Sequence, residues 1–208
     1  QENVRKQDCF IIQPTGPSEN GSPNDNFMEI LILVDALKRG SANSVTVVMP
    51  YYGYERQDRK DYSRAPISAR VIATCLEALK VDRVITFDLH AGQIQGFFSC
   101  NTPVDNLYVE SYFIKYIRES IIKKKLKSKT LICVSPDVGG VQRTRGLATR
   151  IKADLAIIDK RRPRAGQSKV MNIIGDVKGK TCIIVDDIID SGGTIVNAVE
   201  ALKKAGAI

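Results

Sequence analysis

Glycines lie beside carboxylates in the segment from Val185 to Thr194, which reads VDDIIDSGGT and joins an apolar run to an amphipathic stretch. Gly192 and Gly193 would let the backbone approach a ligand closely, because glycine has no Cβ. The amides from Ser191 to Thr194 would then point outward at a helix N-terminus, where backbone N–H groups bind anions. We therefore predict that this segment binds a phosphate group.

The carboxylates of the same segment narrow the choice of ligand. Asp186 and Asp187 could accept hydrogen bonds from sugar hydroxyls beside the phosphate. The alternative is an ordinary helix cap at Asp190 or Ser191. Because a cap explains neither of the two adjacent carboxylates, the pattern favours a sugar phosphate.

Polar residues also occur next to other apolar runs. Arg56 beside Gln57 offers donors to a phosphate or a base edge, with a solvated charged loop as an equal alternative. His90, the only histidine, comes two residues after Asp88, so an extended backbone would place both side chains on one face. Taken alone, His90 is more often a hydrogen-bonded structural residue, and Asp137 is more often a helix cap.

The basic run from Lys160 to Arg164 resembles a nuclear-import or nucleic-acid patch. The net charge of +8 is consistent with a solvated basic surface, with nucleic acid or with polyphosphate ligands. Five scattered cysteines without a CxxC pair indicate reduced, intracellular thiols. No apolar run approaches the roughly 20 residues that span a bilayer.

Short apolar runs alternate with amphipathic stretches along the whole chain, which predicts an α/β fold of parallel sheets covered on both faces. We expect two related doubly wound domains, residues 1–108 and 109–208, with ligands beyond the carboxyl ends of the strands. Residues 13–26, 99–103 and 161–168 are expected to be loops. The expected strands are 9–12, 45–49, 84–87, 131–134, 155–158 and 182–185, and the expected helices are 27–37, 67–79, 112–117, 140–152 and one that closes the chain.

Four stretches together resemble one family. Residues 185–194 resemble the phosphoribosyl-diphosphate-binding motif that type I phosphoribosyltransferases share with the ribose-phosphate diphosphokinases. The stretch 54–69 resembles the ATP-contacting segment of the diphosphokinases, and 88–98 resembles their metal and triphosphate site. Residues 134–140 resemble the turn that opens their second domain. Because the stretches occur in the family's order and cover nearly the whole chain, the sequence is identified as a member of the diphosphokinase family.

The resemblance implies a site for each substrate. The expected ATP-binding residues are Arg56, Gln57, Asp61 and His90. The expected ribose 5-phosphate residues are Asp186, Asp187, Asp190, Ser191, Gly192, Gly193 and Thr194. The expected catalytic residues are Lys160, Arg162 and His90. Lys160 and Arg162 match two cations of a flexible catalytic loop, where they would stabilise charge that develops on phosphate oxygens.

The resemblance also implies Mg²⁺, which would bridge phosphate oxygens. The expected metal ligands are Asp88, His90, Asp105 and Asp137. Ser99 stands near a position where relatives carry a carboxylate, and this departure weakens the metal assignment around it. The sequence lacks an initiating Met and the family's first and last segments, so we expect a fragment in which both domains are incomplete.

The expected reaction converts ATP and ribose 5-phosphate to AMP and 5-phosphoribosyl 1-diphosphate. Two alternatives remain. A salvage phosphoribosyltransferase would use the same sugar-phosphate segment without the ATP-like stretches, and a non-catalytic regulatory relative would keep the fold and lose the catalytic cations. We expect a cytoplasmic homo-oligomer that binds neither nucleic acid nor membrane.

Overall fold

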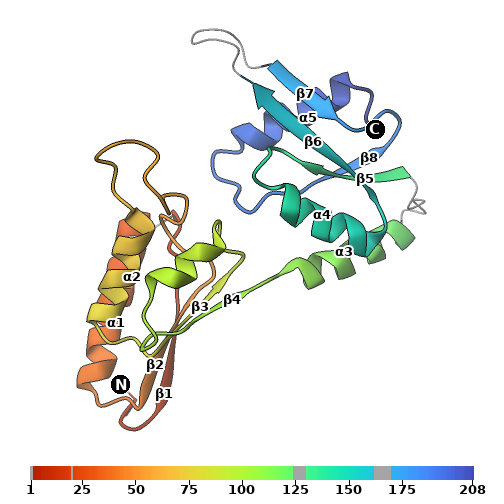
Figure 1. Ribbon diagram of the computed structural model, residues 1–208. Coiled ribbons are helices and arrows are strands. Elements are labelled where there is room, and N and C mark those ends of the chain that lie inside the picture. The colour runs from red at the N-terminus through yellow and green to blue at the C-terminus, as the bar shows by residue number, and fades with distance from the viewer. Residues whose placement is uncertain (1, 20, 124–129, 162–169) are drawn as a thin grey trace. The chain divides into compact units, whose positions relative to one another are not determined.

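The computed structural model describes residues 2–19, 21–123, 130–161 and 170–208. The chain divides into two compact units, Gln1–Val109 and Glu110–Ile208, and each is described by itself (Figure 1). Within the described ranges no helix has the length and apolar character needed to cross a membrane.

The first unit is a four-stranded parallel sheet in which the strands follow one another in space, in the order β1-β2-β3-β4. Parallel crossovers are right-handed, so strands added in one direction place their helices on the same face. Figure 1 shows α1 and α2 side by side along this sheet. The elements are β1 (Asp8–Ile12), α1 (Pro23–Arg39), β2 (Ser44–Met49), α2 (Ser68–Ala78), β3 (Arg83–Phe87), the 3-10 helix η1 (Gly92–Phe97) and β4 (Val104–Leu107).

The core of the first unit lies between the sheet and its helices. Val45 and Val47 of β2 pack with Ile30 of α1 and Leu76 of α2, and all four are fully buried. On the opposite face the side chains of Phe10 and Ile12 are 63% and 69% exposed. We expected helices on both faces, but the helices of this unit cover only one, because its strand order never reverses.

The second unit is a mixed sheet in the order β7-β6-β5-β8, covered on both faces. Cys133 of β5 packs against helices α3 and α4, while Ile132 and Val134 pack on the side of α5. The chain leaves β5 through α4 toward β6, and leaves β8 into α5 on the other face. This is the doubly wound arrangement that the sequence predicts. The elements are α3 (Glu110–Lys123), β5 (Leu131–Ser135), α4 (Val141–Ile151), β6 (Asp154–Arg161), β7 (Val170–Ile174), β8 (Thr181–Ile184) and α5 (Gly193–Lys204).

Three features differ from the sequence-based expectation. The loop expected over residues 13–26 ends at Ser22, since Ser22 and Asp25 form a capping box and Pro23 begins α1; proline is favoured at a first helical position. Strand β4 was not predicted, because half of its residues are polar. Strand β7 was also not predicted, and it pairs antiparallel to β6.

Candidate functional site

The second unit brings two loops together at the carboxyl ends of neighbouring strands. β5 and β8 are adjacent and parallel, and their helices lie on opposite faces, so the crevice between their ends is a topological switch point, where α/β sheets bind ligands. Asp137 follows β5, and Asp186 with Asp187 follows β8. Burial, followed by a side-chain hydrogen bond with Asp187 and by the negative charges of Asp187 and Asp137, raises the pKa of Asp186 to about 6. The three predicted carboxylates therefore interact.

The loop after β8 ends in an open turn at the start of α5. Gly192 has φ +77°, in the left-handed region that favours glycine, and its carbonyl accepts a hydrogen bond from the Val196 N–H at 2.9 Å. A Cβ on Gly192 would meet no atom within 4 Å, and one on Gly193 only Ser191 Oγ at 3.8 Å. The N-cap position of α5 is Gly192, which has no side chain, so neither Asp190 nor Ser191 occupies that position. The predicted residues Asp190 to Thr194 form this single turn.

The turn between β5 and α4 is held by its own polar groups. Asp137 Oδ1 accepts a hydrogen bond from the Gly140 N–H at 2.9 Å, and Ser135 Oγ donates to the Asp137 carbonyl at 2.7 Å. A Cβ on Gly140 would lie 2.9 Å from Ser135 Oγ, so the turn leaves no room for a side chain there. The Asp137 side chain thus bonds within the turn, whereas the N-cap position of α4 is Gly140. Its role as a metal ligand stays a prediction.

In the first unit the two predicted ATP stretches form adjoining loops beyond β2 and β3. The loop after β3 is joined to the loop after β2 by Gln93 Nε2, which donates to Asp58 Oδ2 at 2.5 Å, and by the backbone N–H of His90, which donates to Glu55 Oε2 at 2.9 Å. The side chains of Arg56 and His90 are exposed. The structure therefore brings the loops of these two predicted residues together.

The other predicted ATP residues differ in what holds them. Gln57 Oε1 accepts a hydrogen bond from Ser68 Oγ at the start of α2, and this fixes the side chain against the helix. Asp61 is exposed and pairs with Arg59 at 3.1 Å. Such an exposed pair contributes little stability, so Asp61 belongs to the solvated outer part of the loop.

The predicted metal ligands of the first unit do not share the expected geometry. Asp88 has φ +46°, so the segment is not extended, and the argument that Asp88 and His90 share a face is wrong. Asp88 Oδ2 accepts from the Val109 N–H at 3.2 Å, and Asp105 pairs with Arg83 at 2.5 Å. Across the described part of the chain, no three His, Cys, Asp or Glu side chains gather in a group that could hold a metal.

Of the two cations predicted for the catalytic loop, Lys160 lies near the end of β6. We expected a loop over residues 161–168, but β6 continues through Arg161, and Lys160 is paired with Met171 of β7. Arg162 lies outside the described residues.

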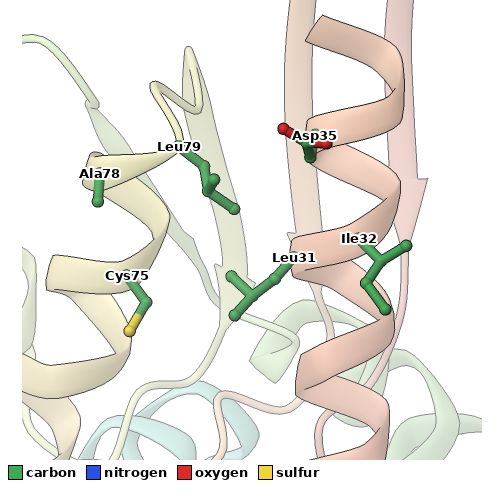
Figure 2. A pocket seen from close by; sticks show the side chains of 6 residues that line it. All are labelled: Leu31, Ile32, Asp35, Cys75, Ala78 and Leu79. Carbon is green, nitrogen blue, oxygen red and sulfur yellow. The ribbon is translucent and has the colours of Figure 1, made fainter. Parts of the chain in front are cut away.

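An apolar groove between α1 and α2 lies apart from these loops. Figure 2 shows its lining side chains, which come from the middle of α1 and from the last turn of α2. That turn leads to the amino end of β3, opposite the ends that carry the predicted site. Asp35 is the one charged residue among those that line the groove, so nothing here attracts a phosphate. The lining residues are Leu31, Ile32, Asp35, Cys75, Ala78 and Leu79.

Sequence reasoning missed two residues that hold the first unit's loops in place. Glu55 accepts from the backbone of His90, and Asn106 Oδ1 accepts from the Leu89 N–H at 3.1 Å. Glu55 stands in a charged stretch that reads as solvated, and Asn106 lies in the strand that was not predicted. The residues that they contact are 35 and 17 positions away, so no local pattern could have revealed them.

The Asp186 carboxyl group should titrate near pH 6 in carboxyl-carbon NMR, because burial and the charge of Asp187 oppose its ionisation. The pKa of Asp186 is higher in the folded protein than in the unfolded chain. The Asp186 carboxyl group therefore stabilises the fold at pH values below its unfolded pKa, and this contribution is lost as the pH rises through about 6. Asp187→Asn should lower the Asp186 pKa. Asp190→Asn is the matched control, and an equal effect of the two variants would contradict the assignment.

Comparison with known proteins agrees with this geometry. A model of the N-terminal domain of ribose phosphate pyrophosphokinase (pyrophosphokinase and diphosphokinase being synonyms) matches residues 1–79. A model of the phosphoribosyl transferase domain matches residues 104–208. A ribose-phosphate pyrophosphokinase from Bradyrhizobium diazoefficiens is 57% identical over 207 residues, covering 100% of this chain and 62% of the relative. One from Campylobacter jejuni is 55% identical over 207 residues, covering 99% and 63%.

A solved structure is similar over the same length. The phosphoribosylpyrophosphate synthetase from Mycobacterium smegmatis is 42% identical, with a TM-score of 0.85 over 99% of this chain and 63% of that one. The chain therefore spans less than two thirds of the length of these relatives. Because the two domain models match most of the chain in the order in which its two units occur, the chain belongs to the ribose-phosphate pyrophosphokinase family.

Proposed function

We propose that the full-length protein containing this chain transfers diphosphate from ATP to ribose 5-phosphate, giving AMP and 5-phosphoribosyl 1-diphosphate. One observation carries this proposal. The open phosphate turn of the second unit occurs in the same chain as the joined loops of Arg56 and His90 in the first unit. A salvage phosphoribosyltransferase would need only the phosphate turn of the second unit.

Ribose 5-phosphate would bind at the switch point of the second unit. The amides at the start of α5, from Gly193 to Thr194, would donate to the 5-phosphate, since the first amides of a helix have no partner within it. Asp186 and Asp187 would accept hydrogen bonds from the ring hydroxyls. Asp186 would be ionised above about pH 6, the value to which its pKa is raised.

ATP would bind at the loops of the first unit. The exposed Arg56 would form charge-assisted hydrogen bonds with phosphate oxygens or with the base edge, which its planar guanidinium suits. Gln57 would add an amide contact, Asp61 a carboxylate at the outer end of the loop, and His90 a contact to the triphosphate. The bonds that join the two loops support a site that is organised before ATP arrives.

Transfer would take place by attack of the sugar's C1 hydroxyl oxygen on the β-phosphorus. The new O–P bond forms as the bond between the β-phosphorus and the oxygen bridging to the α-phosphorus breaks, the hydroxyl proton passes to solvent, and AMP leaves. Lys160 and Arg162 would stabilise the negative charge that develops on the phosphate oxygens.

Mg²⁺, when bound, would supply positive charge that offsets the negative charge of the phosphate groups. The donor set fits it: Mg²⁺ is usually held by one or two carboxylates together with substrate phosphates and water, so a cluster of three protein ligands is not required. Asp88 and His90 in the first unit, and separately Asp137 in the second, would be the residues that could hold it. Asp105 fits less well, because its carboxylate is already paired with Arg83.

The protein's setting is proposed on separate grounds. All five cysteines are free, which supports a reducing, cytoplasmic location. The exposed apolar side chains of Phe10, Ile12 and Leu107 support a further packing partner on that face of the first sheet. That partner would be either the rest of the full-length chain or a second subunit of a homo-oligomer.

Release of AMP tests the proposal. The full-length protein should form AMP from ATP only when ribose 5-phosphate and Mg²⁺ are both present, as measured by chromatography of the nucleotides. Loss of 5-phosphoribosyl 1-diphosphate that depends on an added base, without AMP, would instead indicate a salvage phosphoribosyltransferase. Binding of both substrates without turnover would indicate a non-catalytic relative.

A further inference from the structure

A buried carboxyl group joins the two loops of the proposed ATP site. The side chain of Glu55 is only 2% exposed, although those of Tyr54 and Arg56 on either side of it are exposed. Its Oε2 accepts a hydrogen bond from the His90 backbone N–H at 2.9 Å. A carboxyl group buried in this way is costly unless hydrogen bonds compensate, so its place in the interior indicates a specific bonding role.

Both loops have backbone conformations that need such support. Tyr54 has φ +64° and Asp88 has φ +46°, and non-glycine residues in the left-handed region persist only where the surroundings hold them. Glu55 directly follows the first of these residues, and its partner His90 comes two residues after the second. The hydrogen bond therefore connects the two strained turns.

The base of the first loop is firmly anchored beneath Glu55. The side chain of Tyr52 is 1% exposed, and its hydroxyl donates to the Ala69 carbonyl of α2 at 2.9 Å. Burial raises the pKa of the Tyr52 phenol, and the charge of Glu55 raises it further, so the two side chains lie close together. Glu55 thus extends from a fixed point in the core to the backbone of the second loop.

We infer that Glu55 is a positioning residue, which fixes the backbone of His90 relative to the Arg56 loop and so organises the site for ATP. The inference rests on the proposed function, because it assigns ATP to these loops. It predicts that loss of the Glu55 oxygen loosens the His90 loop and weakens the use of ATP, while the ribose 5-phosphate site in the other unit is unaffected.

Three variants of the full-length protein separate this role from general stability. Glu55→Ala removes the acceptor of the His90 amide, and Glu55→Gln keeps an oxygen that can accept it. Thr102→Val is the matched control. The Thr102 side chain is 3% exposed and donates to the Val81 carbonyl at 2.8 Å, so the variant loses a buried hydrogen bond just before β3, at the opposite end of that strand from His90.

Hydrogen exchange of the His90 amide reads out the bond directly and does not depend on turnover. The amides of β2 report unfolding of the whole unit. After correction for any change at those amides, the His90 amide should exchange at least tenfold faster in Glu55→Ala than in wild type. Glu55→Gln should stay near wild type, and Thr102→Val should not change the His90 amide selectively. Equal His90 exchange in wild type and Glu55→Ala, or fast exchange in Glu55→Gln, would overturn the inference.

Steady-state kinetics of the same variants tests the consequence for ATP. The KM for ATP should rise about tenfold in Glu55→Ala, because ATP binding would then have to order the His90 loop, at a cost of about one hydrogen bond. The KM for ribose 5-phosphate should stay unchanged. In Glu55→Gln the KM for ATP should be close to that of wild type. A rise in both KM values, or in neither, would contradict the role in ATP use. If the wild-type protein forms no AMP, the proposed function fails, while hydrogen exchange still decides whether Glu55 positions His90.

Discussion

Gly193→Val should abolish measurable binding of ribose 5-phosphate while the protein remains folded. A Cβ at Gly193 meets only Ser191 Oγ, at 3.8 Å, and the residue's φ is not positive, so the free protein has room for the side chain. Valine would occupy the place of the phosphate at the start of α5 and block two charge-assisted amide bonds. Their loss corresponds to roughly a 100-fold or greater weakening, which calorimetry on the full-length protein would detect.

Two further valine variants separate ligand contact from backbone strain. Gly192 and Gly179 both have left-handed φ values, +77° and +67°, and a Cβ on either would meet no atom within 4 Å. Gly192→Val and Gly179→Val should therefore lose similar amounts of stability, while only Gly192→Val loses the sugar phosphate. Wild-type affinity in Gly193→Val, or equal loss of affinity in Gly192→Val and Gly179→Val, would refute the assignment of this turn.

Alanine at Lys160 or Arg162 should lower kcat by roughly 100-fold or more with little change in KM, because a group that acts on transition-state charge contributes little to ground-state binding. Arg164→Ala is the control, since it removes a cation from the same basic run. Steady-state kinetics decides between this role and the alternative of a nucleic-acid patch. Unchanged turnover together with loss of salt-dependent RNA or DNA binding would favour the alternative.

Where strand, turn and helix follow one another locally, the sequence predicted the structure well. The strand at Leu131–Val134, the helix across 140–152 and the turn that leads into a helix at Ser191–Thr194 are confirmed, because an apolar run, a glycine pair and helical spacing are all local signals. Phosphate binding at that turn stays a prediction. The order of β5 and β8 explains why Asp137 and Asp186 interact. Asp137 and Asp186 follow neighbouring strands at a switch point, where ligand sites lie. Their proximity can therefore be predicted from the strand order without atomic detail.

Features that depend on distant partners could not be predicted. β7 is a short, mostly apolar run, Val170–Ile174, but its antiparallel pairing with β6 depends on the fold and not on a local signal. β4 forms because its backbone completes the ladder of β3, although half of its side chains are polar. Glu55 is buried because it meets a backbone amide 35 residues away, whereas its neighbours in sequence predict a solvated loop.

The central claim is that the β- and γ-phosphates of ATP move together to the sugar, and ³¹P NMR of the complete reaction tests it most directly. With the full-length protein, ATP, ribose 5-phosphate and Mg²⁺, the three ATP resonances should be replaced by the single resonance of AMP and by two coupled resonances of a diphosphate on the sugar, in equal amounts. Appearance of ADP, or of inorganic phosphate without a sugar diphosphate, would contradict the account.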